Sequence, residues 1–519
     1  MSGGVNTRDD VQLNDKHLAV LAPGRNCRRI ATAHHAGLLI DGEPYFTALE
    51  SALRAASRSI LIIGWDFDAR IQLRPQDGPD AITLGDLLRR LVEQKPELEV
   101  RILVWSLAPI HAPGAATSLV FGAAWLDHPR IHLRLDTQHP LHAAHHQKMV
   151  VIDDSLAFVG GIDLTVARWD TSHHAPSEPN RRNPDGSSYQ PVHDMQMAVD
   201  GPAAREVAIV AHERWQTCTG EKIHIVEPVE NWPSGLSPTF TNVPVGVSRT
   251  LPALDARQAV EESAALTEDL LRAAKRSVYI EAQYFTAKYL RRILSGVLSR
   301  PDPPEIVVVG PLNANGIIER FIMGANRERL LRSLRKVDRK NRLRVYYPVI
   351  DDGESECEVL VHAKLMIVDD MILRIGSSNL NNRSVGLDTE CDLVIEANGP
   401  ETRHTISQYR DRLLGEHLAV DPARMRAAIE QHNSVIGAIE ALNGGTRRLR
   451  PVPIGKGPTH SFPGTRLLDP ERPFGFVEKL YSWWHNRPAQ DGSDERGVRE
   501  SSISDKKSEM LPKRSGSRK

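Results

Sequence analysis

Along the chain, apolar residues recur first at the spacing of a helix and then in the dense run of a buried strand. From Glu50 to Phe67 (ESALRAASRSILIIGWDF) they recur at helical spacing and then form a dense aliphatic run, which predicts a helix followed by a buried strand. Glu268 to Phe285 (EDLLRAAKRSVYIEAQYF) repeats this order without a gap. Any α/β protein contains several helix-strand pairs, but the length of the ungapped match favours an internal repeat.

More strand-like segments follow each copy of the repeat in the same order. Leu98 to Ser106 and Ile131 to Asp136 follow the first copy, and Glu305 to Pro311 and Leu343 to Val349 follow the second. Alternation of strands and helices predicts β-α-β units around a parallel or mixed sheet. We therefore expect an α/β protein with two similar lobes.

Changes in composition divide the chain further. Residues between the two copies are rich in Pro, Gly, Ser and Thr, which is typical of a connector, and the last thirty or so are polar and nearly free of large apolar residues. The predicted organisation is an amino-terminal segment (1–29), a first lobe (30–225), a connector (226–252), a second lobe (253–420), a helical and aromatic extension (421–487) and a disordered tail (488–519).

Charge and cysteine content exclude several classes of protein. Lys and Arg number 65 against 66 Asp and Glu, so the chain lacks the overall basic field of a dedicated nucleic-acid binder. The four cysteines form no C-x-x-C pair, which argues against a disulfide framework or a thiolate zinc site. The amino terminus has no apolar signal-peptide core, and we expect no membrane-spanning helix.

Each lobe carries the pattern H-x-K-x-x-x-x-D. The first copy is His146, Lys148 and Asp153, and the second is His362, Lys364 and Asp369. Alternation along a strand places His and Lys on the same face. A buried lysine beside an imidazole is costly unless an anion binds there, so the pattern indicates an anion site.

A turn of small residues follows each motif. It reads Gly160-Gly161-Ile162-Asp163 in the first lobe and Gly376-Ser377-Ser378-Asn379 in the second. Such turns expose backbone N–H groups to phosphate oxygens. We expect Gly161, Asp163, Ser377 and Asn379 to contact a phosphate together with Lys148 and Lys364.

The doubled motif and its turns resemble the signature of the phospholipase D superfamily, over about residues 30–420. Further matching pieces are Arg168-Trp169-Asp170, His193-Asp194 and Tyr279 to Phe285, which is similar to a segment of eukaryotic-type phospholipases D with Ala282 in place of Asn. The resemblance implies two phospholipase D-like α/β lobes that form one active site at their interface.

The resemblance also implies roles for the motif residues. His146 is the expected nucleophile and His362 the general acid, although the near-symmetric sequence does not fix this order. Asp194 is expected to anchor His146, and Glu390 to anchor His362. We group Asp153 and Asp369 with the catalytic motifs, but expect them to bond backbone or lysine and not to transfer protons.

The implied activity is hydrolysis of phospholipids such as phosphatidylcholine or phosphatidylethanolamine to phosphatidic acid, through a phosphohistidine and with water or an alcohol as acceptor. Cardiolipin synthase-like phosphatidyl transfer is one alternative, and a nuclease or other non-lipid phosphodiesterase is another. A polar stretch of about 20 extra residues between Asp170 and Val192 predicts a surface loop near the site and favours a lipid substrate.

The remaining expectations concern partners, cofactors and location. We expect no cofactor and no metal, since His142, His145, His173 and His174 lack the spacing of known metal motifs. The expected partner is a phospholipid membrane surface, with no dedicated nucleic-acid partner. The expected location is cytoplasmic or peripheral to a membrane, with secretion without a cleaved signal as the alternative.

Overall fold

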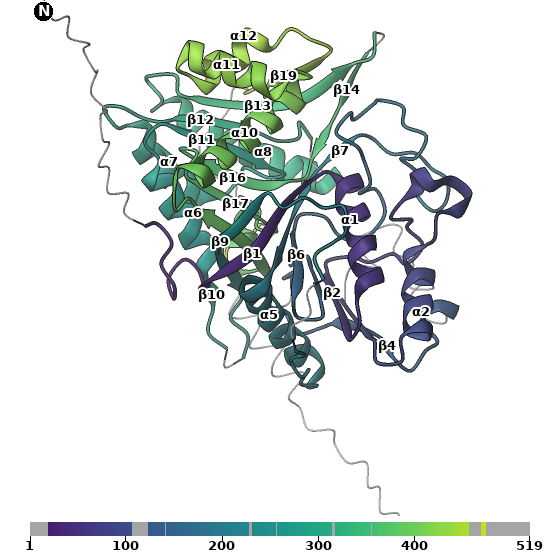
Figure 1. The fold of residues 1–519 in the computed structure, drawn as a ribbon. Helices are drawn as coiled ribbons and strands as arrows, with labels where there is room; N and C mark the ends of the chain where they lie inside the picture. Colours follow the sequence, from purple (N-terminus) through teal and green to yellow (C-terminus); the bar gives the residue numbers. More distant parts are fainter. Residues whose placement is uncertain are drawn as a thin grey trace, which may run out of the picture.

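A computed structural model describes most of the chain (Figure 1). The described residues are 19–105, 123–140, 142–227, 231–255, 257–313, 317–353, 355–455 and 469–473. The predicted tail and the aromatic part of the extension lie outside these ranges. No helix within them is long and apolar enough to cross a membrane.

Strands and helices alternate through both halves of the chain. The first half contains β1 (Arg29–Ile40), α1 (Gly42–Ala55), β2 (Ser59–Gly64), α2 (Leu84–Gln94), β3 (Glu99–Trp105), β4 (Ile131–Asp136), β5 (Met149–Ile152), β6 (Leu156–Gly160), β7 (Val192–His193), β8 (Met195–Asp200) and α5 (Gly201–Thr219), with short 3₁₀ helices at Pro75–Asp80 and Ala124–Leu126. The second half contains β9 (Phe240–Leu251), β10 (Val260–Glu261), α6 (Glu262–Ala273), β11 (Ser277–Ala282), α7 (Lys288–Leu298), β12 (Glu305–Val309), α8 (Ile317–Arg335), β13 (Leu343–Asp351), β14 (Glu356–Glu358), β15 (Leu360–Val361), β16 (Lys364–Val368), β17 (Ile372–Gly376), α9 (Arg383–Gly386), β18 (Glu390–Glu396), α10 (Pro400–Leu418), α11 (Pro422–His432), α12 (Val435–Leu442) and β19 (Arg447–Pro451).

The strand order of one half mirrors that of the other. Hydrogen-bonded neighbours run β4-β3-β2-β5-β6-β8-β1 in the first half and β9-β18-β17-β16-β11-β12-β13 in the second, with β1 paired to β9. In each half the strands farthest from this pair are parallel, and the others are antiparallel. The predicted α/β class and the internal repeat are confirmed.

The predicted connector is partly wrong. Strand β9 falls inside 226–252 and pairs with both β1 and β18, at the centre of the sheet. Val243, Val245 and Val247 alternate along this strand with Pro244 and Gly246, and all three valines are buried. The Pro and Thr that suggested a connector lie on or beside this strand.

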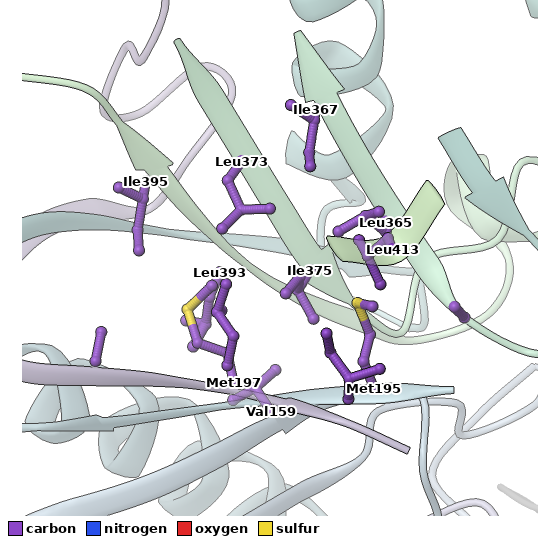
Figure 2. Close-up of a cluster of buried hydrophobic side chains, with 14 of the residues drawn as sticks. Val159, Met195, Met197, Leu365, Ile367, Leu373, Ile375, Leu393, Ile395 and Leu413 are labelled. Carbon is purple, nitrogen blue, oxygen red and sulfur yellow. The ribbon is translucent and has the colours of Figure 1, made fainter. Parts of the chain in front are cut away.

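The two halves pack against each other through the faces of their strands. Strands β6 and β8 of the first half contact β17 and β18 of the second. Figure 2 shows Val159, Met195 and Met197 below the strands that carry Leu373, Ile375 and Leu393, all of them buried. Burial of such a side chain contributes about 1.5–3 kcal/mol. This shared core holds the two motif-bearing strands, β5 and β16, in a fixed relation.

Asp153 and Asp369 hold the turn between helix and strand in each half. Asp153 accepts hydrogen bonds from the backbone N–H groups of Ser57, Arg58 and Ser59 at 2.7–2.8 Å, and Asp369 accepts the equivalent three from residues 275–277. Both lie just after the strand that each histidine precedes. Their grouping with the catalytic residues is therefore corrected, while the expected bonding to backbone is confirmed.

Replacement of Asp153 by asparagine is expected to cost stability and not chemistry. The amide can accept fewer hydrogen bonds and places an N–H group against backbone donors, which we expect to lower the free energy of unfolding by about 2–3 kcal/mol. Urea unfolding measures this loss, and turnover per folded molecule is expected to stay near wild type. The surface variant Asp77→Asn, which removes the exposed ion pair with Arg74, is the control. A loss of turnover without a loss of stability would contradict this assignment.

Candidate active site

Each histidine of the paired motif is fixed by a backbone contact with the other half of the chain. The N–H of His146 donates to the carbonyl of Thr389 at 3.1 Å, beside a parallel bridge between His145 and Thr389. The N–H of His362 donates to the carbonyl of His193 at 2.7 Å, where β15 pairs in parallel with β7. The two motifs therefore meet at the boundary between the halves.

The carboxylates that anchor the histidines are exchanged relative to the prediction. Nδ1 of His146 lies 3.0 Å from Oε2 of Glu390, and Nδ1 of His362 lies 2.6 Å from Oδ2 of Asp194. Glu390 directly follows Thr389, and Asp194 directly follows His193. The cross-half backbone pairing thus brings each histidine to the carboxylate of the other half, and the predicted pairing within each lobe is wrong.

The two motif lysines are almost fully buried. Nζ of Lys148 lies 2.9 Å from Oδ2 of Asp163, and Nζ of Lys364 lies 3.1 Å from Oε1 of Gln283 and 3.0 Å from Nδ1 of His362. Their exposed fractions are 2% and 4%. An ammonium buried with so few anionic partners is costly, which indicates that an anion completes the site.

In the small-residue turns, Gly161 and Ser377 make hydrogen bonds within the protein. The N–H groups of Gly161 and Ser377 donate to the carbonyls of Met195 and Cys391 at 3.0 Å, so they are already used in the sheet. The Ser377 hydroxyl donates to Glu390 at 2.6 Å. The predicted phosphate contacts of Gly161 and Ser377 are therefore corrected.

Asp163 and Asn379 occupy equivalent places after these turns and differ in what they bond. Asp163 is committed to Lys148 and to the N–H of Trp65. Asn379 is buried, and its side-chain oxygen has no hydrogen-bond partner among the described residues. The amide of Asn379 is therefore free to meet a ligand, and its N–H₂ group is the part that can donate to a phosphoryl oxygen.

Gly161 leaves the space that the Asp194 carboxylate fills. A Cβ atom at position 161 would lie 2.0 Å from Oδ1 of Asp194. The variant Gly161→Ala is therefore expected to displace this carboxylate from His362 and to lower turnover by about 10²-fold or more. Gly296→Ala is the matched control, because a Cβ there meets nothing within 4 Å in helix α7, and it should raise stability by up to about 1 kcal/mol. Normal turnover of Gly161→Ala would contradict this geometry.

Without a bound anion, burial and the motif lysines hold the pKa of both histidines below its usual value. Burial, together with Lys148 and Lys364, holds the pKa of His146 well below its usual value. Burial and Lys364 lower the pKa of His362 to about 3, although Asp194 acts in the opposite direction. Lysines from both halves thus lower the pKa of His146, which indicates that the two motifs form one site.

Two further groups have displaced pKa values. Burial lowers the pKa of Lys364 to about 7, and Lys148 acts in the same direction. Burial raises the pKa of the Glu390 carboxyl to about 8, although two hydroxyl donors oppose the shift. An anion bound between the lysines would raise the pKa of the histidines and of Lys364, since it offsets their mutual repulsion.

Several residues of the site were not assigned a role from the sequence. Gln283 bonds Lys364, and the Ser384 hydroxyl donates to Glu390 at 2.6 Å. Arg168 adds positive charge that lowers the pKa values of His362 and Lys364. Gln283 and Arg168 lie in segments that match the family pattern, which is the signal that pointed to them, whereas nothing in the sequence marks Ser384.

The extra loop of the first half is built around one buried arginine. Arg181 is 2% exposed and donates to Asp170, to the carbonyls of Ala175 and Pro176 and to that of Tyr189. The loop ends in β7, which leads directly into Asp194. It is thus an ordered segment that ends at the site, as the sequence predicted for its position.

Comparisons with known proteins identify relatives of this chain. Residues 132–233 match the family described as "Phospholipase D", and residues 268–414 match that described as "Cardiolipin synthase, PLD-like domain". Phospholipase D A of Dictyostelium discoideum is 24% identical over 470 residues, which cover 74% of this chain and 36% of that protein. Phospholipase D alpha 4 of Arabidopsis thaliana is 24% identical over 515 residues, which cover 76% and 67%.

A solved structure shares the fold. The crystal structure of phosphatidylserine synthase from Haemophilus influenzae Rd KW20 matches with a TM-score of 0.50 and 13% identity, over 80% of this chain and 96% of that one. The chain spans about a third of the Dictyostelium relative. The two family matches each contain one of the paired motifs that the structure brings together at the boundary between its halves. The chain belongs to the phospholipase D superfamily.

Proposed function

We propose that the protein is a phospholipase D-type phosphodiesterase that hydrolyses phospholipids to phosphatidic acid and a free headgroup. The observation that carries this proposal is the arrangement of two histidine-lysine pairs at one boundary, with each histidine held by a carboxylate of the other half. Such a site offers a nucleophile, an acid and two cations for one phosphodiester.

The first step forms a covalent phosphohistidine. Glu390 accepts the Nδ1 proton of His146, so Nε2 carries the lone pair that attacks phosphorus. The bond from phosphorus to the headgroup oxygen breaks, and His362, which is protonated in the complex because the bound phosphate raises its pKa, donates its proton to that oxygen. Lys148, Lys364 and Asn379 stabilise the charge on the remaining phosphoryl oxygens. Family resemblance assigns the nucleophile to His146.

The second step returns the enzyme to its starting state. His362, now neutral, accepts a proton from water, whose oxygen attacks phosphorus while the bond to His146 breaks. Two displacements retain the configuration at phosphorus. An alcohol in place of water would give phosphatidyl transfer, and the match to the cardiolipin synthase description makes this the second candidate activity.

The substrate reaches the site from a membrane surface in this proposal. The described residues contain no membrane-spanning helix, so a lipid substrate has to be met at the surface of the bilayer. The exposed fractions of the two histidine side chains are 14% and 8%, which is compatible with a narrow entrance for a headgroup phosphate. The proposed location is cytoplasmic or peripheral to a membrane.

Product analysis tests the substrate class. Vesicles of phosphatidylcholine, phosphatidylethanolamine or phosphatidylglycerol are incubated briefly with the enzyme in EDTA, with and without an alcohol. We expect phosphatidic acid, and phosphatidyl alcohol when the alcohol is present. Cleavage of bis-p-nitrophenyl phosphate or nucleic acid without cleavage of any lipid would overturn the lipid substrate but not the chemistry.

The pH dependence of the reaction is set in part by Glu390. Its protonated carboxyl can donate to Nδ1 of His146 and would leave the proton on Nε2, which then cannot attack. Because the pKa of Glu390 is raised to about 8, kcat/KM is expected to rise with pH as this carboxyl ionises. The Glu390→Gln variant should lose this limb of the profile. A limb near pH 8 that persists in the variant would contradict the assignment.

A further inference from the structure

A second group of titratable side chains lies beside the active site and is not used in the proposed chemistry. It consists of Asp41, between β1 and α1, His174 in the extra loop, His193 in β7 and Glu416 in α10. Asp41, His174 and His193 are 0% exposed, and the Glu416 side chain is 6% exposed. Three of the four belong to the first half of the chain and one to the second.

One atom from each side chain points into a common centre. Oδ1 of Asp41, Nε2 of His174, Nδ1 of His193 and Oε1 of Glu416 all lie within 4.8 Å of one another. The four separations that join a histidine nitrogen to a carboxylate oxygen are 2.9, 3.1, 3.2 and 3.7 Å. Ligand atoms about 2.0–2.1 Å from a tetrahedral zinc lie about 3.3 Å apart.

One hydrogen bond lies within the group, between Nε2 of His174 and Oε1 of Glu416 at 3.2 Å, and it leaves the positions of Asp41 and His193 unexplained. Nδ1 of His193 lies 2.9 Å from Asp41 and 3.1 Å from Glu416, yet it has no hydrogen bond to either oxygen. Neither carboxylate oxygen of Asp41 has a hydrogen-bond partner among the described residues. Fully buried polar atoms without hydrogen-bond partners are rare. Two of these atoms, Oδ1 of Asp41 and Nδ1 of His193, belong to the set that faces the shared centre.

The opposite ring nitrogen of each histidine is held by a second carboxylate. Nδ1 of His174 lies 3.0 Å from Asp170, and Nε2 of His193 lies 2.9 Å from Glu281. Metal-ligating histidines nearly always make such a bond with the nitrogen that faces away from the metal. This outer pair orients the inner nitrogens toward the centre.

We propose that Asp41, His174, His193 and Glu416 bind one divalent transition-metal ion, with Zn²⁺ as the best fit. Two imidazoles and two carboxylates in a tetrahedron suit zinc, whereas Ca²⁺ and Mg²⁺ prefer more oxygen ligands. The competing occupant of the centre is a pair of protons, one on each histidine, which would supply the same positive charge.

The ion would join the two halves of the chain at the active site. Glu416 comes from α10 of the second half and the other three ligands from the first. His193 precedes Asp194, whose carboxylate holds His362, so the ion would fix the strand that presents this carboxylate. Its ligands are buried, and the phosphoryl chemistry proposed above needs no contact with it. This site is therefore structural and independent of the proposed reaction.

Metal content and thermal unfolding test the proposal. The full chain is purified without an affinity tag or chelator, dialysed against metal-free buffer and analysed by inductively coupled plasma mass spectrometry. We expect about one zinc per chain. Prolonged treatment with 1,10-phenanthroline should lower the melting temperature, and added Zn²⁺ should restore it. Co²⁺ in its place should give the intense visible bands of tetrahedral cobalt.

Variants separate this site from the other histidines. Glu416→Gln and His174→Gln are expected to retain less than about a fifth of the metal. His212→Gln is the matched control, because His212 lies 2.9 Å from Asp154 and belongs to no metal-like group among the described residues, and it should retain the full amount. His146→Ala should also retain it, whatever its lipid activity.

Measurements on the wild-type protein alone can overturn the proposal, even if a ligand variant does not fold. A chain without stoichiometric metal whose melting temperature does not respond to Zn²⁺ would show that the centre holds protons. Metal retained in both Glu416→Gln and His174→Gln would place the ion elsewhere.

Discussion

His146→Ala and His362→Ala are each expected to lower kcat by about 10⁴-fold or more on phospholipid vesicles. The first variant removes the atom that attacks phosphorus, and the second removes the proton donor for the headgroup oxygen. Because the two histidines act in one reaction, the double variant should be little worse than either single variant. Initial rates of phosphatidic acid release measure the effect.

The control for these variants is His212→Ala, which removes a half-buried histidine of helix α5 that pairs with Asp154. Its turnover per folded molecule should stay near that of the wild type. If the losses of His146→Ala and His362→Ala multiplied in the double variant, the two histidines would be acting independently, which would contradict a single shared site.

The second large effect is expected at Asp194 and Glu390, the carboxylates that each hold the histidine of the other half. Asp194→Asn and Glu390→Gln keep the shape of each side chain but change the tautomer of the histidine that it holds, and each should lower kcat by about 10²–10⁴-fold. Asp194 acts through His362, the expected acid. Asp194→Asn should therefore lose far less activity on a p-nitrophenyl ester, whose leaving group needs no proton, than on a lipid.

Glu390→Gln provides the comparison within the same experiment. Glu390 acts through His146, the expected nucleophile. The Glu390→Gln variant should therefore lose activity to a similar extent with good and poor leaving groups. If Glu390→Gln were rescued by the p-nitrophenyl ester and Asp194→Asn were not, the roles of the two histidines would be reversed. Equal losses for both variants on both substrates would contradict a division of roles.

The fold was largely predictable because its signals are local. The spacing of apolar residues within one stretch of about 18 residues predicts helix α1 and strand β2, and a second such stretch predicts their counterparts α6 and β11. Strand β9 was not recognised, since its Pro, Gly and Thr residues resemble a linker and its burial depends on pairing with β1 and β18. That pairing is a tertiary contact with no local sequence signal.

The composition of the site was predictable, and its internal bonding was only partly so. Regular spacing marked both histidines and both lysines, but the partner of each histidine depends on which strands pair across the halves. Gly161 and Ser377 were expected at the phosphate because the sequence does not show that their N–H groups are used within the sheet.

The second buried centre could not be predicted from spacing. Asp41 and Glu416 lie far from the two histidines in sequence, and His174 was considered only with its neighbours in the chain. Only the folded arrangement brings these four side chains together.

The central claim is that the reaction passes through a phosphohistidine on this chain. The most direct test is acid-free rapid quenching during turnover of a phospholipid, followed by proteolysis at alkaline pH and mass spectrometry of the peptides. The account predicts a phosphatidyl adduct on the peptide that contains His146, absent from His146→Ala and accumulating in His362→Ala with a good leaving group. Turnover at the normal rate without an adduct on either His146 or His362 would contradict it.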